Sequence, residues 1–293
     1  MTGKPRRRHQ SVGAALSHAT EVLSRAGVDS PAVDASALVE AVTGLSRTDQ
    51  LLRRDAALEA HQAEELERLL ARRAAREPLQ HVLGEVTFLD VRLEARPGVL
   101  VPRPETERLV ELVLSEIRDA PIRRGDTIID VGTGTGAIAL ALKQARPELA
   151  VWATDVSQAA LDLAGVNAQR LGLALELRRS DLLRDPEVMA AATRAVAIVS
   201  NPPYLPDADR DVVQPEVAVE PEAALYAGPD GLNVARRLAG LAREAMRPGA
   251  LLALELDPRN VSVLAREFEA LGFAAVRVEP DLAGRDRFVI AYR

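Results

Sequence analysis

A glycine-rich loop followed by an acidic residue is the first place where this sequence could do chemistry. The run Gly132-Thr133-Gly134-Thr135-Gly136 follows the apolar segment Thr127–Val131. Glycine lets the backbone approach a ligand closely, and the N-terminus of a following helix leaves amide groups free to bind it. Asp155 follows Gly132 at close to the ~20-residue separation expected of a carboxylate that binds ribose hydroxyls. The pattern predicts a nucleoside-containing ligand.

The details of this loop favour S-adenosyl-L-methionine, with S-adenosyl-L-homocysteine as product, over a dinucleotide. The spacing is G-x-G-x-G instead of G-x-G-x-x-G, and Asp130 stands just ahead of it. S-adenosyl-L-methionine has no pyrophosphate, so the loop need only surround its methionine and ribose portions. Asp181, at the end of the third predicted strand, is placed to meet the adenine amine. The alternative is that Asp155 and Asp181 only cap strand ends.

The segment Asn201-Pro202-Pro203-Tyr204 follows a second apolar strand, 196–199. It resembles the N-P-P-Y motif of methyltransferases that act on planar nitrogens: adenine amines, cytosine amines and glutamine amides. An amide nitrogen is a poor nucleophile, but the Asn201 side-chain oxygen and the Pro202 carbonyl can accept both of its N–H groups. The prolines at 202 and 203 fix the backbone, and Tyr204 offers a flat face to the planar group. A proline-rich turn capped by asparagine is the alternative.

Alternating strands and helices position these residues. Strands are predicted at 127–131, 150–154, 174–179, 195–200, 250–256, 273–279 and 286–292, with helices from the glycine loop to 145 and over 157–171. This alternation predicts an α/β fold, a mainly parallel sheet with helices on both faces. Taken with the resemblance of residues 201–204, it implies the Rossmann-like architecture of a class I S-adenosyl-L-methionine-dependent methyltransferase.

The residues before this region follow a different pattern, so we expect the whole chain to have three parts. Helical spacing predicts an N-terminal bundle over 1–77, a structural or substrate-docking module whose helices span 11–26, 31–42 and 58–76. Short alternating runs at 86–88 and 91–93 predict a β-hairpin linker over 78–103. The methyltransferase domain then covers 104–293, and its first helix begins at Pro104 with Glu105 and Glu107 in the first turn.

Composition narrows the function classes. The 293 residues carry a formal charge of -6, which argues against bare nucleic acid as the principal ligand. The Arg6-Arg7-Arg8 run is most simply interpreted as part of a solvated N-terminal segment. There are no cysteines and only 4 scattered histidines, so neither disulfides nor a metal site is expected. No stretch approaches the ~20 apolar residues of a membrane span and the start is no secretory signal. We expect a cytoplasmic monomer.

Over roughly 75–293 the chain resembles the release factor glutamine methyltransferase family. The most specific matching segments are Val101-Pro-Arg-Pro-Glu105-Thr106-Glu107 and Gly284-Arg-Asp-Arg287. The resemblance implies a seven-stranded sheet and, as substrate, the side-chain amide of the glutamine in the Gly-Gly-Gln motif of peptide chain release factors. By position it implies that residues 132–136, Asp155 and Asn201 bind the donor, that 201–204 hold the glutamine amide, and that Glu105 lines the pocket rim with helix capping as its alternative.

Two positions depart from that family. Leu182 stands where an aromatic commonly flanks the adenine, which implies aliphatic packing there. Glu255 is retained, which implies a place at the border of the donor pocket, but Asp257 replaces a glycine, which puts the geometry of that loop in question.

Three other functions remain open on the sequence. A ribosomal-protein glutamine methyltransferase shares the 201–204 core. A nucleic-acid amino-methyltransferase usually carries a basic recognition segment, and none is visible. A non-catalytic donor-binding protein is disfavoured because Asn201, Tyr204 and the glycine loop are intact.

Overall fold

The computed structural model describes residues 10–293, and the chain divides into two compact units. The first contains the residues up to Gly84 together with Gln214–Val219, and the second contains Glu85–Val213 and Glu220–Arg293. The Arg6-Arg7-Arg8 run lies outside the described residues. Across residues 10–293, no helix is long and apolar enough to cross a membrane.

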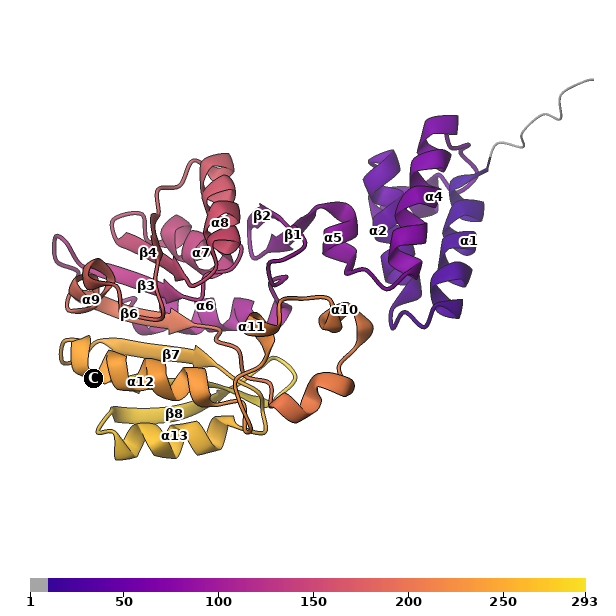
Figure 1. Ribbon diagram of the computed structural model, residues 1–293. Helices are drawn as coiled ribbons and strands as arrows, with labels where there is room; N and C mark the ends of the chain where they lie inside the picture. The colour runs from indigo at the N-terminus through magenta and orange to yellow at the C-terminus, as the bar shows by residue number, and fades with distance from the viewer. Residues whose placement is uncertain (1–9) are drawn as a thin grey trace, which may run out of the picture. The chain divides into compact units, whose positions relative to one another are not determined.

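The first unit packs short helices around an apolar core that contains Leu23, Leu38 and Leu66 (Figure 1). Ser11 caps the first helix by accepting a hydrogen bond from the backbone N–H of Ala14 at 3.2 Å. The helices that precede Gly84 are α1 (Val12–Arg25), α2 (Pro31–Thr43), α3 (Arg47–Leu52), α4 (Ala60–Ala74) and α5 (Leu79–Leu83).

Helices α3 and α5 are absent from the sequence-based description. Residues 79–83 were expected to lie in the β-hairpin linker, and the structure corrects this, because they form the single helical turn of α5 between Pro78 and the left-handed Gly84. A helix of five residues is too short to show the 3.6-residue periodicity on which the prediction relied.

An ion-pair cluster joins residues 214–219 to the helical core of this unit. Glu216, in α10 (Pro215–Ala218), accepts hydrogen bonds from Arg73 at 2.7 Å and from Arg76 at 2.6 Å. Arg73 also donates to Asp34 at 2.7 Å. Burial by itself raises the pKa of Glu216, but the hydrogen bonds from Arg76 and Arg73 outweigh it and lower that pKa to about 2. The carboxylate is therefore ionised over the physiological pH range.

The second unit begins with a hairpin and continues into a seven-stranded sheet. In the hairpin, β1 (Glu85–Phe88) and β2 (Val91–Glu94) pair antiparallel. The sheet has the order β5-β4-β3-β6-β7-β9-β8. Its strands are β3 (Thr127–Val131), β4 (Ala150–Asp155), β5 (Glu176–Arg179), β6 (Ala195–Ser200), β7 (Leu251–Glu255), β8 (Ala274–Pro280) and β9 (Asp286–Tyr292).

Most of this sheet is parallel. Strand β3 pairs in parallel with β4 and β6, β4 with β5, and β6 with β7, whereas β9 is antiparallel to both β7 and β8. The predicted α/β fold with a seven-stranded, mainly parallel sheet is confirmed. Strand β5 is shorter than the predicted 174–179 and begins at Glu176.

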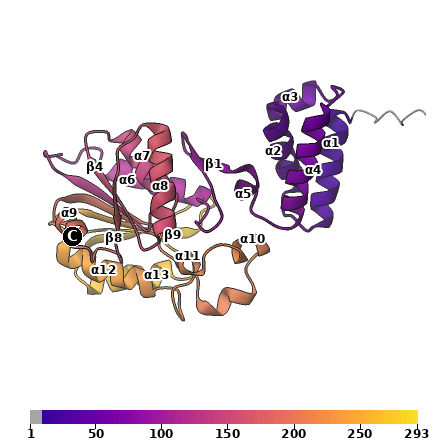
Figure 2. The ribbon, with the colours of Figure 1, turned by 45° about the horizontal axis from the view of Figure 1, so that its top comes forward.

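Helices cover both faces of the sheet (Figures 1 and 2). One apolar cluster contains Leu109 and Leu140, and the other contains Leu238 and Leu264. The helices of the first cluster are α6 (Pro104–Glu116), α7 (Ala137–Ala145) and α8 (Gln158–Leu171), and those of the second are α9 (Pro186–Ala192), α12 (Asn233–Ala245) and α13 (Val261–Ala270).

The strand order fixes where a ligand can bind. From β3 the chain proceeds to β4 and β5 on one side and later to β6 and β7 on the other. The loops after β3 and β6 therefore leave the sheet in opposite directions and open a crevice at its carboxyl edge. In open α/β sheets, ligands bind at this switch point.

Candidate active site

The glycine loop after β3 is held in place by its own buried groups. Gly132 and Gly134 have φ values of 76° and 55°, in the left-handed region that glycine adopts without strain. Asp130 is fully buried and accepts hydrogen bonds from Thr133 Oγ1 at 2.6 Å and from the Ala139 N–H at 3.1 Å. Burial raises the pKa of Asp130 to about 7. Asp130 thus fixes the conformation of the loop through these two buried hydrogen bonds.

Asp155 closes the loop from the neighbouring strand. It is the last residue of β4, and its two carboxylate oxygens accept from the Gly134 N–H at 3.0 Å and the Ser157 N–H at 2.8 Å. Burial raises the pKa of Asp155 above its usual value, against these backbone donors. Each oxygen keeps further acceptor capacity for a ligand hydroxyl.

A cavity of about 370 Å³ opens at the carboxyl edge of the sheet, within the second unit. This volume lies in the range of about 300–1,000 Å³ that is usual for small-molecule sites. Residues from the loops after β3, β4, β5 and β6 meet there, as the strand order requires. The predicted residues that line it are Gly132, Thr133, Gly134, Thr135, Asp155, Asp181, Leu182, Asn201, Pro202 and Pro203.

Four predicted residues are not among those that line this cavity: Gly136, Tyr204, Glu105 and Glu255. Gly136 is the N-cap residue of α7, and a Cβ there would lie 3.2 Å from the Cβ of Ala164, so its missing side chain lets α8 pack closely. Tyr204 packs against the second apolar cluster, and burial raises the pKa of its phenol above the usual value.

The adenine end of the predicted donor site is polar on one side and aliphatic on the other. Asp181 lies two positions beyond the end of β5 and forms an ion pair with Arg237, which also lines the cavity. Leu182 has a φ of 58°, which is unusual for a residue with a Cβ. A conformation of this kind costs about 1–3 kcal/mol and persists only where the surroundings impose it.

The donor set fits S-adenosyl-L-methionine. Asp155 offers acceptors to a diol, and the hydroxyl of Thr135 has no hydrogen-bond partner within residues 10–293, although it is buried at the cavity. Part of the cavity wall is aliphatic, from Val99, Ala160 and Leu182. The same described range contains no group of three or more His, Cys, Asp or Glu side chains that could hold a metal ion.

The Asn201–Tyr204 segment is fixed at both ends. Before it, Ser200 donates from its hydroxyl to the carbonyl of Val131 at 2.6 Å, which links β6 to β3. After it, the carbonyl of Tyr204 lies so close to Gly231 that a Cβ at 231 would be 2.1 Å from that oxygen. The peptide planes of this segment are therefore set by the fold as well as by the two prolines.

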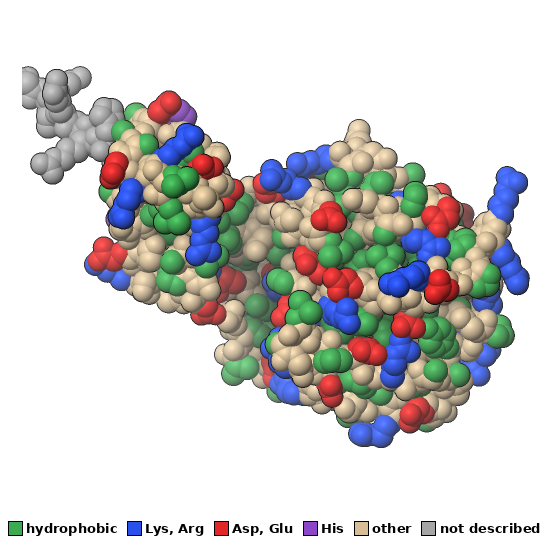
Figure 3. All heavy atoms as spheres, turned by 180° about the vertical axis from the view of Figure 1, so that it is seen from behind, with side chains coloured by type: hydrophobic (Ala, Val, Ile, Leu, Met, Phe, Trp, Pro, Cys, Tyr) green, Lys and Arg blue, Asp and Glu red, His purple; other side chains and the backbone are tan. Residues whose placement is uncertain are grey.

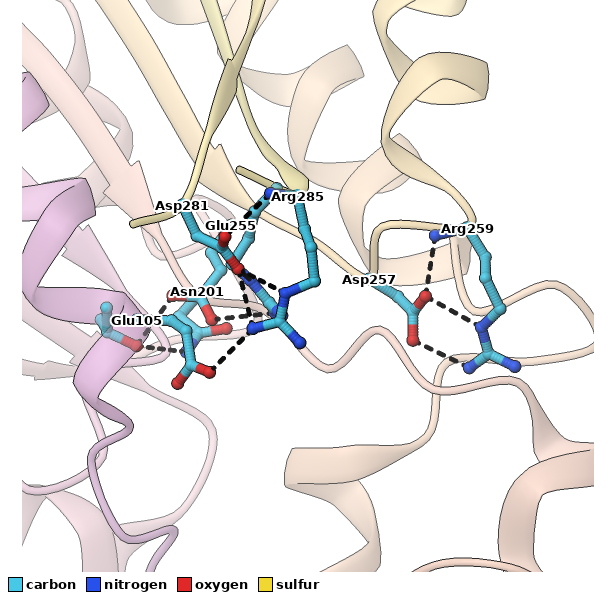
Figure 4. Close-up of polar contacts among 9 residues, drawn as sticks. Glu105, Asn201, Glu255, Asp257, Arg259, Asp281 and Arg285 are labelled. Carbon is cyan, nitrogen blue, oxygen red and sulfur yellow. Dashed lines mark hydrogen bonds and ion pairs between the residues drawn. The ribbon is translucent and has the colours of Figure 1, made fainter. Parts of the chain in front are cut away.

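Behind Asn201 lies a polar network that sequence reasoning did not find (Figure 4). Asn201 Nδ2 donates to Thr106 Oγ1 at 3.0 Å, and Thr106 Oγ1 donates to Glu255 Oε2 at 2.8 Å. Glu255 is fully buried, and burial raises its pKa to about 7. Glu105, one position before Thr106, instead pairs with Arg285 at 3.4 Å. In the sequence, the Pro-Arg-Pro-Glu-Thr-Glu run and the retained Glu255 pointed to this region, but neither indicated that Thr106 links Glu255 to Asn201.

Glu220, which belongs to the Glu220-Pro221 segment that matches the family, is a second functional candidate to which the sequence assigned no role. Its carboxylate is buried, accepts from the Val101 N–H at 3.0 Å and pairs with Arg103. Burial raises the pKa of Glu220, which the two partners oppose. Glu220 therefore fixes the segment that leads into α6, and with it the position of Thr106.

The loop that contains Asp257 is regular despite the replaced glycine. Asp257 accepts from the backbone N–H of Arg259 at 2.8 Å and pairs with its guanidinium, as Figure 4 shows. Within residues 10–293, the non-glycine residues with positive φ are Arg76, Leu89, Leu182 and Ala275. Asp257 is not among them, so it adopts its conformation without the strain of a positive φ.

Comparison with known proteins agrees with the fold. The "Methyltransferase small domain" family model matches residues 94–240, and the "PrmC N-terminal domain" model matches residues 14–84. A solved structure of the Thermus thermophilus 16S rRNA N2 G1207 methyltransferase shares the fold, with a TM-score of 0.52 and 19% identity over 71% of this chain and 49% of that one. The fold and the site thus define an α/β methyltransferase with a Rossmann-like sheet.

Relatives of known name narrow this class. A "Release factor glutamine methyltransferase" from Deinococcus radiodurans is 49% identical over 95% of this chain and 97% of its own length. A relative of the same name from Gloeobacter violaceus is 40% identical over 90% of this chain and 91% of its own length. This chain belongs to the release factor glutamine methyltransferase family.

Proposed function

We propose that this chain transfers a methyl group from S-adenosyl-L-methionine to the side-chain amide nitrogen of a glutamine in peptide chain release factors. The observation that carries the proposal is that one cavity is lined both by the glycine loop with Asp155 and by Asn201 to Pro203. A donor site and a pair of acceptors for a planar nitrogen therefore share one enclosure. Family membership supports the same reaction.

The donor is held by the edge of the sheet at β3, β4 and β5. Gly132 to Thr135 surround its amino-acid portion, Gly136 supports that loop by letting α8 pack closely, and Asp155 accepts from the ribose hydroxyls. Asp181 meets the adenine amine while Leu182 packs on the ring, and Asn201 closes the site. The bound donor supplies an electrophilic sulfonium methyl. The residues of the chain orient the acceptor nitrogen and keep water from the cavity.

The glutamine amide is held by Asn201 to Tyr204. The Oδ1 atom of Asn201 and the carbonyl of Pro202 accept the two N–H hydrogens, which aligns the nitrogen lone pair and stabilises the positive charge that develops on it. Pro203 fixes the direction of the backbone, and Tyr204 offers its ring to the planar amide. We assign Glu105 to the rim of this site. Burial raises the pKa of the Tyr204 phenol and keeps it protonated, so Tyr204 does not act as a base in the reaction.

The protein substrate is a release factor, and the target is the glutamine of its Gly-Gly-Gln motif. We assign the helical bundle, residues 1–77, to substrate docking, residues 78–103 to the linker and 104–293 to catalysis. The enzyme acts as a monomer in the cytoplasm, where release factors work.

Nucleic acid is the less favoured substrate. The net charge is -6, and on the face shown in Figure 3 acidic and basic side chains are interspersed instead of forming one basic patch. A protein that grips phosphates needs concentrated positive charge.

The test is the transfer of labelled methyl from S-adenosyl-L-methionine to a purified release factor. A release factor with Gln→Ala in its Gly-Gly-Gln motif is the control. Label that requires this glutamine supports both the reaction and the substrate. Donor binding without label on the release factor, together with label on ribosomal protein or RNA, would replace the substrate and keep the methyltransferase.

A further inference from the structure

The amide of Asn201 is joined to a buried carboxylate by a single side chain. Thr106, near the start of α6, is only 4% exposed and lies between Asn201 after β6 and Glu255 at the end of β7. The two hydrogen bonds measure 3.0 Å from Asn201 Nδ2 to Thr106 Oγ1 and 2.8 Å from Thr106 Oγ1 to Glu255 Oε2. Three elements that are distant in sequence thus converge on one hydroxyl.

The chemistry of these groups sets the direction of both hydrogen bonds. An ionised carboxylate only accepts, so Thr106 must donate its single hydroxyl proton to Glu255. The threonine oxygen can then only accept from Asn201, which requires the NH₂ end of the asparagine amide to face Thr106. The Oδ1 atom is left at the other end, and it accepts no hydrogen bond within residues 10–293. Because Asn201 lines the cavity, this oxygen is available to a substrate.

We propose that Thr106 is a positioning residue for methyl transfer: with Glu255 it fixes the Asn201 amide so that Oδ1 is presented to the incoming nitrogen. This inference rests on the proposed function, in which Oδ1 accepts an N–H of the glutamine amide. An asparagine amide that is turned over would present its NH₂ group to the NH₂ group of the substrate. One of the two acceptors would then be lost, and two donors would face each other.

The surroundings of Glu255 are suited to this task. Arg287 approaches Oε1 at 3.9 Å and donates to Asp281 at 3.2 Å, so it opposes the burial of the carboxylate without occupying Oε2. Glu105 and Arg103 act on Glu255 with opposite signs of charge, and Tyr204 faces it as a neutral phenol. Burial raises the pKa of Glu255 to about 7, so assays belong at a pH of about 8.5, where the group accepts only.

The decisive variants are Thr106→Val and Thr106→Ser. Valine keeps the shape of threonine but lacks the hydroxyl, whereas serine keeps the hydroxyl and loses only the methyl group. Thr127→Val is the matched control, because Thr127 is also buried and donates from its hydroxyl to the Ala191 carbonyl at 3.0 Å, at the opposite end of β3. All variants are compared for methyl transfer to a release factor, donor affinity and melting temperature.

We expect Thr106→Val to lower kcat about tenfold, the effect of losing one orienting hydrogen bond of ordinary strength. The KM for the release factor and the Kd for the donor should stay within about twofold of wild type, because both ligands still bind the same surfaces. Thr106→Ser should restore kcat to within about threefold of wild type. Thr127→Val should lower the melting temperature without lowering kcat.

Glu255→Gln tests whether the carboxylate of Glu255 sets the direction of the two hydrogen bonds. Glutamine has both a donor and an acceptor, so it can reverse the chain and turn the Asn201 amide over. Its kcat should lie between those of wild type and Thr106→Val. The double variant Thr106→Val, Glu255→Gln should be no slower than Thr106→Val alone, because both changes act through the same amide.

The outcomes separate this inference from the proposed function. If wild type does not methylate the release factor, the proposed function fails first. If wild type is active and Asn201→Ala is not, but Thr106→Val turns over like wild type or Thr106→Ser is as slow as Thr106→Val, the positioning role is overturned. The positioning role would also be overturned if the loss of kcat in the double variant equalled the product of the losses in the two single variants.

Discussion

Replacing Asp155 gives the sharpest test of the donor site. Its carboxylate is held by the N–H groups of Gly134 and Ser157 at 3.0 Å and 2.8 Å, and it faces the cavity. A hydrogen bond to a charged group contributes about 1.5–3 kcal/mol. Loss of one such bond to the ribose corresponds to donor binding that is weaker by about 10- to 100-fold. We expect Asp155→Ala to show this loss, with the glycine loop loosened as well.

Calorimetric titration with S-adenosyl-L-methionine and S-adenosyl-L-homocysteine measures the effect. Asp162→Asn is the control, because Asp162 lies on the exposed side of α8 and the one hydrogen bond of its carboxylate within residues 10–293 is from Gln158 at 2.9 Å. Its affinity should match wild type. A folded Asp155→Ala protein that binds either ligand within about twofold of wild type would refute the ribose role, since less than 0.5 kcal/mol would then depend on it.

The same carboxylate predicts a pH dependence. Burial raises the pKa of Asp155, and protonation removes an acceptor from the site. Donor affinity of wild type should therefore decline as the pH falls through a range above the usual aspartate value. The decline should be absent in Asp155→Ala, and its persistence there would assign the titration to another group.

Three further predictions concern the acceptor site and the stability of each unit. Asn201→Ala should lower methyl transfer by about 10²-fold or more while largely sparing donor affinity, and near-normal turnover would contradict the amide-orienting role. Glu216→Gln should lower the free energy of unfolding of the first unit by about 3 kcal/mol at pH 7, because an ion-pair cluster loses its central charge. Since the pKa of Glu216 is lowered to about 2 from 4.5, the stability that it contributes is present above pH 4.5 and lost as the pH falls toward 2, which denaturation at both pH values would detect. Gly231→Ala should unfold at a lower temperature and transfer methyl more slowly than Gly249→Ala, because a Cβ at 231 meets the Tyr204 carbonyl at 2.1 Å whereas at 249 nothing lies within 4 Å, and equal effects would show that this contact is unimportant.

The sequence predicted well those features that depend on neighbouring residues. The strand before Gly132, the helix after it and the two prolines after Asn201 are each decided within a few positions, by side-chain alternation and by the backbone limits of glycine and proline. The fold class followed from the order of these elements. Short elements such as α5 were missed because a few residues do not display a period.

Some assignments required the side-chain environment. Gly136 was grouped with the ligand loop, but in the structure its missing side chain makes room for Ala164 of α8. Leu182 was recognised as unusual by residue type, whereas its positive φ of 58° could not be read from the sequence. The strand order decides which loops share the cavity, and it is set by pairing between distant segments.

By itself, the sequence determined the chemistry that is available: a glycine loop, an acidic strand end and an Asn-Pro-Pro-Tyr segment, each spelled out by contiguous residues. Only the tertiary structure decided that Thr106 and Glu255 stand behind Asn201, since these residues come from α6, β7 and the end of β6. The physical reason is that a hydrogen bond requires its atoms to lie within about 3 Å, and long-range packing alone brings such segments together.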